Sequence, residues 1–328
     1  MKKLATKLDV GNLTLSGRFV IPPMAVETAP YGLVTDATKA HYQTIAEKSG
    51  AALILTEHFY VDYLGKASRK QLSAADDSVI PGMKVLTDAV HTSSRSKFFC
   101  QISHAGRQSS PKFTQHTLMA PSPIAKPGLS FVPQEMSEEQ IQEEVWRFGQ
   151  AARRVKAGGF DGVEIHAAHG YLLNQFYSPL SNQRTDEYGP QSVENRMRFL
   201  IQVVREVRKQ VGDDFPIAVR FGGCDYTEGG STIQDAADGA ELLEKEGIDL
   251  LDISGGLIGF TRPDGKSDAG FFKDMSLEVK KRVDLPVILT GGVKSMQDAE
   301  ALLEENAADL IGVCRALFFN PDGSRKKW

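Results

Sequence analysis

Short apolar runs of four to six residues alternate with longer amphipathic patterns along nearly the whole chain. Runs of this length, bounded by turn-forming residues, are typical of buried strands. The runs that we predict to be strands are residues 19–22, 51–56, 97–102, 162–165, 216–221, 250–253, 286–289 and 310–313. Strands that alternate with helices in this way are usually parallel and joined by helical crossovers.

The stretches between these runs repeat their apolar residues at helical spacing, and several carry capping residues. Ser137, Ser192, Thr232 and Ser295 stand at N-cap positions, and Gly158-Gly159 ends one stretch. The stretches that we predict to be helices are residues 37–48, 82–92, 137–158, 192–211, 232–247, 275–283, 295–305 and a short one from residue 316. Eight strands with eight helices favour an α/β fold of the closed (β/α)8 TIM-barrel type over an open doubly wound sheet.

One long segment interrupts the alternation. Residues 109–133 are rich in Pro and Ser, so we expect an excursion loop inside a single domain that spans residues 1–328. No Gly-x-Gly-x-x-Gly motif follows the first predicted strand, which argues against a dinucleotide-binding sheet.

The composition is that of a globular protein with a sizeable core, with 41% hydrophobic residues, 24% charged residues and a net charge of −4. Neither sign of charge forms long runs, so nucleic acid and anionic membranes are not expected partners. Three widely spaced cysteines argue against a disulfide framework. No signal peptide and no apolar stretch near the ~20 residues of a membrane span can be recognised. We expect a cytoplasmic, homo-oligomeric protein that acts on a small molecule.

Functional residues of such barrels lie at the carboxyl ends of the strands, which converts the strand prediction into a set of candidates. The candidates are Pro23, Met24, Ala25, Glu57, His58, Gln101, Glu164, His166, His169, Tyr171, Arg220, Ser254, Gly291, Gly292, Cys314 and Arg315.

Gly291, Gly292 and Arg315 follow the last two strands, where barrels of this type commonly bind phosphate. Glycines allow backbone N–H groups to approach an anion, and an arginine adds a charge-assisted contact. The alternative is a tight turn beside a surface ion pair.

Arg220 follows three apolar residues and should point into the mouth of the barrel. A buried charge is costly unless it is paired. Glu164 on the neighbouring strand is one possible partner, and a cofactor that becomes anionic during turnover is another. The sequence leaves both open.

His166, His169 and Tyr171 share one strand end. Two histidines three residues apart, without a nearby third ligand, are a weak zinc motif, so we predict no metal site. As hydrogen-bond donors they could hold a carbonyl or nitro oxygen, and the tyrosine hydroxyl could deliver a proton to carbon. The alternative is a satisfied core histidine pair beside a packing tyrosine.

The ordered motifs HAAHGYLLNQFYSPLSNQRTDEYG, VENRMRF, RFVIPPM and QISHAGR resemble the Old Yellow Enzyme family of FMN-dependent ene-reductases, the NADH:flavin oxidoreductases. The resemblance covers nearly the whole chain and implies FMN at the barrel mouth, with NAD(P)H as hydride donor. The cofactor-binding positions that it implies are Pro23, Met24, Ala25, His58, Gln101, Arg220, Gly291, Gly292, Cys314 and Arg315.

The resemblance also implies that His166 and His169 bind the oxygen of an activated alkene and that Tyr171 is the proton donor. Hydride would pass from the flavin to the β-carbon, in a ping-pong reaction. Ala25, Glu27 and His58 depart from the residues that relatives usually carry, and His58 is bulky where many have Ala or Gly. The chain ends at Trp328, before the iron–sulfur cluster of longer relatives, so electron entry through a cluster is not expected.

Other functions remain open on the sequence. An amine or dienoyl-type flavin dehydrogenase could use the same pocket. A flavin-free, phosphate-binding aldolase or isomerase would normally place a lysine or carboxylate at a strand end, and Lys294 only follows the Gly-Gly turn. A non-catalytic flavin sensor is the third possibility.

Overall fold

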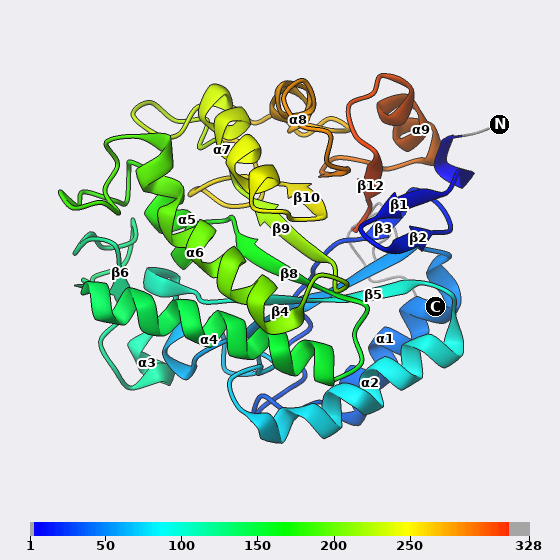
Figure 1. Ribbon diagram of the computed structural model, residues 1–328, viewed down its shortest axis with the longest axis horizontal. Helices are drawn as coiled ribbons and strands as arrows, with labels where there is room; N and C mark the ends of the chain where they lie inside the picture. Colours follow the sequence, from blue (N-terminus) through cyan, green and yellow to red (C-terminus); the bar gives the residue numbers. More distant parts are fainter. Residues whose placement is uncertain (1–2, 315–328) are drawn as a thin grey trace.

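The computed structural model describes residues 3–314, and its centre is a closed barrel of eight parallel strands (Figure 1). In barrel order the strands are β3 (Phe19–Ile21), β4 (Leu53–Tyr60), β5 (Lys97–Ser103), β8 (Gly162–Ala167), β9 (Ile217–Phe221), β10 (Leu250–Ile253), β11 (Val287–Thr290) and β12 (Leu310–Gly312). β12 pairs back to β3, so the sheet has no open edge. The predicted (β/α)8 barrel is therefore confirmed.

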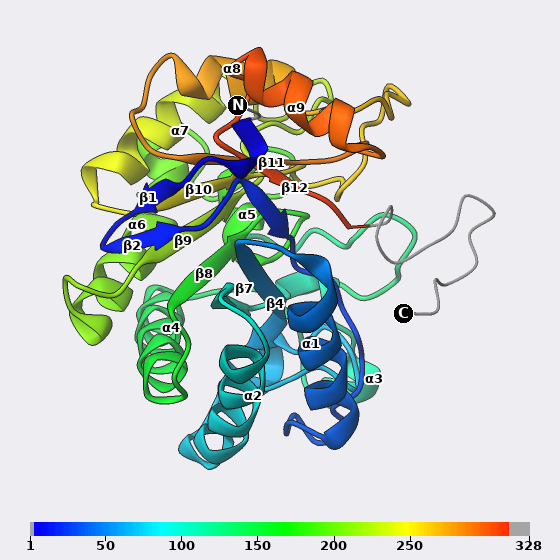
Figure 2. The ribbon, with the colours of Figure 1, turned by 90° about the vertical axis from the view of Figure 1, so that its right-hand side faces the viewer.

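The helices lie outside the ring of strands, as Figure 2 shows. They are α1 (Asp36–Ser49), α2 (Ile80–Ser93), α4 (Glu138–Ala157), α6 (Val193–Val211), α7 (Ile233–Lys245), α8 (Lys273–Lys280) and α9 (Met296–Glu304). The predicted caps Ser137, Ser192, Thr232 and Ser295 each accept a hydrogen bond from the backbone N–H three residues on. The helix predicted from residue 316 lies outside the described residues. Within residues 3–314, no helix is both long and apolar enough to cross a membrane.

A short antiparallel hairpin, β1 (Leu8–Val10) and β2 (Leu13–Leu15), precedes the barrel and was not predicted. Val10 and Leu15 are fully buried and pack in one cluster with residues from the beginnings of the barrel strands. The hairpin therefore closes the amino-terminal end of the barrel, and the candidate residues lie at the opposite end.

The loops at the opposite end contain short elements of their own. The predicted excursion loop includes α3 (Pro111–Thr114) and β6 (Met119–Ala120), which pairs in parallel with β7 (Gln134–Glu135). No helix is predicted directly after Tyr171 from the sequence, but residues Leu172–Tyr177 form the fully buried helix α5.

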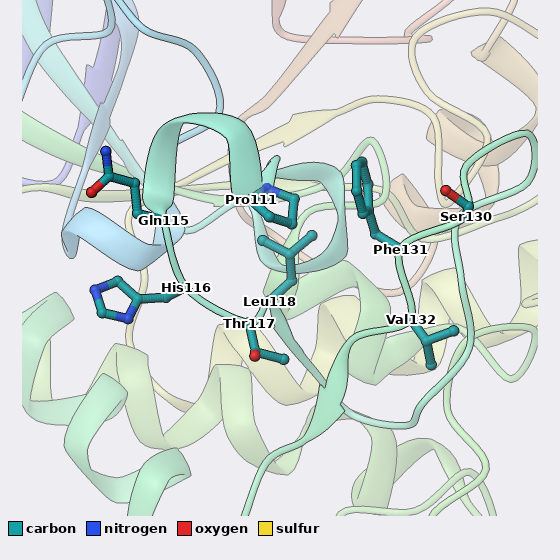
Figure 3. A pocket seen from close by; sticks show the side chains of 8 residues that line it. All are labelled: Pro111, Gln115, His116, Thr117, Leu118, Ser130, Phe131 and Val132. Carbon is teal, nitrogen blue, oxygen red and sulfur yellow. The ribbon is translucent and has the colours of Figure 1, made fainter.

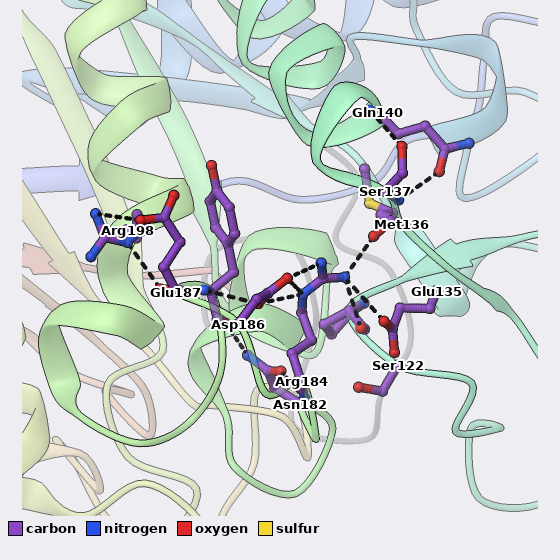
Figure 4. A network of polar contacts seen from close by, with 12 residues as sticks. Ser122, Glu135, Met136, Ser137, Gln140, Asn182, Arg184, Asp186, Glu187 and Arg198 are labelled. Carbon is purple, nitrogen blue, oxygen red and sulfur yellow. Dashed lines mark hydrogen bonds and ion pairs between the residues drawn. The ribbon is translucent and has the colours of Figure 1, made fainter.

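The polar residues of the loop after α5 bond other parts of the fold (Figure 4). The buried guanidinium of Arg184 donates to the carbonyl of Met136 at 2.6 Å and pairs with Asp186. The Asn182 amide donates to two backbone carbonyls, each at 2.7 Å. These bonds tie the loop to β7 and α5, because buried polar groups need partners.

Candidate active site

The strand register places polar residues of four adjacent strands side by side at two successive levels, Gln101 with Glu164 and, two residues further along the strands, His166 with Arg220 and Asp252. Gln101 on β5 lies beside Glu164 on β8, and its amide donates to the Glu164 carboxylate at 2.7 Å. His166 on β8 lies beside Arg220 on β9, which lies beside Asp252 on β10. All five side chains are buried. The barrel therefore collects them in a polar layer, two residues deep, near its carboxyl end.

Four rings form the centre of the site. The ring centroids of His166 lie 5.0 Å from His169 and 4.7 Å from Tyr171, and those of His58 and Tyr171 are 5.3 Å apart. His58 lies within β4 rather than after it, because that strand continues to Tyr60 through an irregularity between Leu55 and His58. The fold therefore brings His166, His169 and Tyr171 together, as predicted, and His58 lies beside Tyr171.

A tight turn at the end of β8 orients the His169 ring. His169 has φ of 59° and Gly170 has φ of 71°, both in the left-handed region. The His169 N–H donates to the Gly255 carbonyl at 3.1 Å, and its Nε2 lies 2.6 Å from the Ser254 hydroxyl. The ring is therefore held from both backbone and side chain.

Burial controls the protonation of the site. It lowers the pKa of His166 and His169 well below the ordinary value, and the nearby Arg220 guanidinium lowers both further. Burial also raises the pKa of Tyr171 to about 12. At neutral pH the site therefore offers two neutral imidazoles, each with one N–H, and a phenol that keeps its proton.

Arg220 has a partner, Asp252, that the sequence does not indicate. Its Nε lies 3.2 Å from Oδ2 of Asp252, although the alignment does not make a hydrogen bond. Its Nη2 donates weakly to Ser254 at 3.5 Å. Burial raises the pKa of both Asp252 and Glu164, while the guanidinium opposes this rise. The charge is thus balanced inside the protein by Asp252.

Several buried polar atoms at this end lack a hydrogen-bond partner among residues 3–314. They are Glu164 Oε2, His166 Nδ1, Arg220 Nε, both oxygens of Asp252, and Thr290 Oγ1. Such atoms are costly to leave unpaired. A polar ligand in the barrel mouth would satisfy part of this set, so the residues present fit a ring system with hydrogen-bonding edges, such as a flavin.

The remaining predicted cofactor residues lie across the mouth. Met24, after β3, contacts Cys314, after β12, with 3.2 Å between the two sulfurs. Pro23 and Met24 are half-buried, and Ala25 is exposed. Arg315 lies outside the described residues, and the roles of all of these positions stay predictions.

The Gly-Gly turn after β11 has a packing explanation. Gly291 and Gly292 have φ of 138° and 68°. A Cβ on Gly292 would lie 1.9 Å from the Asp268 carbonyl oxygen, so glycine is required there whether or not a phosphate binds.

The excursion loop has a separate hollow of about 730 Å³ (Figure 3). Its lining residues are Pro111, Gln115, His116, Thr117, Leu118, Ser130, Phe131 and Val132. None of them is a predicted site residue, so the hollow belongs to the loop rather than to the polar layer.

Asp62, His104 and Glu144 could geometrically surround a metal ion, since one ligand atom from each lies within 4.8 Å of the others. However, His104 Nδ1 accepts a hydrogen bond from the Gly106 N–H at 3.0 Å, which leaves the proton of a neutral ring on Nε2. Metal-bound histidines normally donate through the second nitrogen. Arg147 already lies 2.5 Å from Asp62, so the cluster fits an ion-pair network better than a metal centre.

Glu144 in this cluster gives a pH-dependent prediction. Burial raises the pKa of Glu144 to about 8, so the folded state binds a proton that the unfolded chain releases near its ordinary value of 4.5. The free energy of unfolding should therefore fall as pH rises from about 4.5 to about 8. Relative to the parent, Glu144→Gln should gain at least about 1 kcal/mol between pH 5 and pH 8.

Urea unfolding of both proteins at the two pH values measures this difference. Glu143→Gln, an exposed position on the same helix, is the matched control and should show a smaller change. A parent-to-variant difference that is the same at pH 5 and pH 8 would contradict the prediction.

Comparison with known proteins places this chain in a family. Residues 3–327 match the model of the NADH:flavin oxidoreductase / NADH oxidase family. An NADPH dehydrogenase of Bacillus subtilis strain 168 is 38% identical over 323 residues, which cover 98% of this chain and 92% of that protein. An NADH oxidase of Thermoanaerobacter brockii is 37% identical over 322 residues, covering 97% of this chain and 49% of that protein. The chain thus spans about half the length of the Thermoanaerobacter relative.

The fold is also that of a solved relative. The structure of an old yellow enzyme homologue from Zymomonas mobilis has a TM-score of 0.85 and 27% identity, covering 98% of this chain and 90% of that one. The strand-end motifs therefore indicated the right group of proteins.

Proposed function

The chain belongs to the NADH:flavin oxidoreductase / NADH oxidase family, and from that membership we propose that it reduces activated carbon–carbon double bonds with NAD(P)H through FMN. The observation that supports this most is the joint position of His166, His169 and Tyr171. Two neutral N–H donors beside one protonated phenol suit an α,β-unsaturated carbonyl or nitro compound, which needs its oxygen polarised and its α-carbon protonated.

Residues on other strands of the barrel mouth would hold FMN. Gln101 and Arg220 would bind the edge of its ring, and Gly291-Gly292 its phosphate, together with Arg315. Bound FMN would supply the hydride chemistry, taking a hydride from NAD(P)H and giving one to the β-carbon of the alkene. The fixed charge of Arg220 favours negative charge on a ring bound beside it.

His166 and His169 would act on the substrate as hydrogen-bond donors to one oxygen. Because both rings are neutral, they polarise the oxygen without giving it a proton. Tyr171 would supply the proton, so that its O–H bond breaks as the new C–H bond forms at the α-carbon. The phenol is suited to this role because it remains protonated across the neutral range.

The absorption spectrum of the purified protein is the first test. We expect flavin bands, bleaching by NAD(P)H without oxygen, and reoxidation by 2-cyclohexenone in a ping-pong pattern. A colourless protein that also fails to bind added FMN would overturn the proposal. Turnover of amines but not enones would favour an amine dehydrogenase instead.

A further inference from the structure

We propose that His58 is a positioning residue for Tyr171, whose hydroxyl oxygen accepts a hydrogen bond from His58 Nε2 and whose own proton is thereby directed into the pocket. This inference deepens the proposed function and rests on it. It assigns a role to a side chain that the proposed function does not use.

The side-chain amide of Gln71 determines which ring nitrogen of His58 carries a proton. Gln71 is buried, and its Oε1 accepts the Ala67 N–H at 2.6 Å. Its Nε2 donates to the His58 carbonyl oxygen at 3.0 Å. If the amide were flipped, its NH2 group would face the Ala67 N–H and its oxygen would face the His58 carbonyl oxygen, and neither pair could form a hydrogen bond. The observed orientation is therefore the only one compatible with both backbone groups.

The second hydrogen of the Gln71 amide points to the His58 ring. Gln71 Nε2 lies 2.7 Å from His58 Nδ1, which must therefore be the acceptor. The Ser103 hydroxyl lies 3.1 Å from the same nitrogen and can donate to it as well. Burial and the Arg220 charge lower the pKa of His58 to about 4, so the ring is neutral and its single proton is on Nε2.

That Nε2–H faces Tyr171. The two atoms are 3.5 Å apart, and the rings meet edge-on at 81°. Hydrogen bonds at active sites are often long before the substrate binds and shorten during reaction. The bond strengthens as the hydroxyl loses its proton, because a donor to a charged oxygen is worth more than a donor to a neutral one. The hydrogen bond from His58 therefore opposes the increase in the pKa of Tyr171 that burial causes.

The same contacts exclude a relay through the ring. Passing a proton through His58 would require a proton to arrive at Nδ1 as the Nε2 proton leaves. Nδ1 faces the amide of Gln71 and the hydroxyl of Ser103, and neither is an acid at neutral pH. His58 thus stabilises the phenolate, and the proton returns to Tyr171 from the pocket.

Nitrogen-15 NMR of the histidine rings in the FMN-loaded protein tests the hydrogen bond directly. The sequence has seven histidines, and the His58 signals are those missing from a His58→Gln variant. We expect a neutral ring protonated at Nε2, since protonated and unprotonated ring nitrogens have well-separated shifts. A ring protonated at Nδ1, or a cation at neutral pH, would overturn the inference.

A double-mutant cycle tests the role. His58→Leu should slow reoxidation by 2-cyclohexenone about tenfold to a hundredfold in the parent, the loss expected for one hydrogen bond to a charged group. In a Tyr171→Phe background, His58→Leu should slow this reoxidation less than about twofold, because the hydroxyl that His58 bonds is absent. His58→Gln, which keeps a donor, should retain part of the rate, and in every variant the reoxidation by the enone should lose more of its rate than the reduction by NAD(P)H.

The outcomes separate this inference from the proposed function. An active parent in which His58→Leu slows both backgrounds equally would overturn the role of His58 while leaving ene-reduction intact. A parent that binds FMN but reduces no enone would overturn both the function and this role. Unchanged flavin binding and thermal unfolding in the variants would show that the fold persists.

Discussion

Tyr171→Phe is expected to slow reoxidation of the enzyme by an enone about 10²–10⁴-fold, the usual contribution of a positioned general acid. The change removes one oxygen from a half-buried side chain and leaves the ring contacts with His58 and His166 in place. Reduction by NAD(P)H needs no proton from Tyr171 and should keep its rate. Anaerobic stopped-flow absorbance measures the two half-reactions separately.

Tyr188→Phe is the matched control. Its hydroxyl bonds Gln142 and Gln202 on the outer helices, away from the candidate site, so both half-reactions should keep their rates. Equal losses in the two half-reactions of Tyr171→Phe would argue against a proton donor and for a binding or structural role.

Arg220→Met is expected to lower the free energy of unfolding by about 3–5 kcal/mol, the usual cost of removing one partner from a buried ion pair. The change leaves Asp252, which is fully buried, without the guanidinium 3.2 Å away. Glu164 on the adjacent strand loses the same compensating charge. Urea unfolding, measured with and without FMN, separates this effect from any loss of ligand binding.

An exposed pair provides the control. Arg205 is mostly exposed and pairs with Glu246, so Arg205→Met should cost only about 0–1 kcal/mol. Adding Asp252→Leu to Arg220→Met should recover part of the stability, because the carboxylate closest to the lost guanidinium is then gone as well. A cost for Arg220→Met as small as that of Arg205→Met would show that Asp252 protonates or rehydrates easily.

The barrel strands could be predicted because each is an apolar run buried on both sides, which is the pattern of parallel strands covered by helices. The hairpin β1–β2 was missed because its strands have only three residues each, too few for a period to emerge. Helix α5 was missed because it is also short and, being buried on all sides, shows no alternation of apolar and polar faces. Its six residues are all buried, including Asn174 and Gln175, whose amides bond backbone carbonyls of other loops.

The sequence offered candidate residues more readily than it offered their pairings. His166, His169, Tyr171 and Arg220 could be chosen as candidates because strand ends and sequence motifs are local. Their partners depend on strand register, which places Asp252, rather than Glu164, directly beside Arg220. The irregularity in β4 that brings His58 to Tyr171 could not be read from the sequence, since nothing in LILTEHFY marks where pairing shifts.

The left-handed backbone at His169 has an evolutionary consequence. A side chain at φ of 59° costs of order 1 kcal/mol relative to glycine, yet glycine would remove the imidazole that we propose to bind substrate. Selection for stability and selection for turnover therefore act in opposite directions at this position. A thermostability screen of this protein would enrich glycine at position 169, and the resulting proteins would be more stable but catalytically poor.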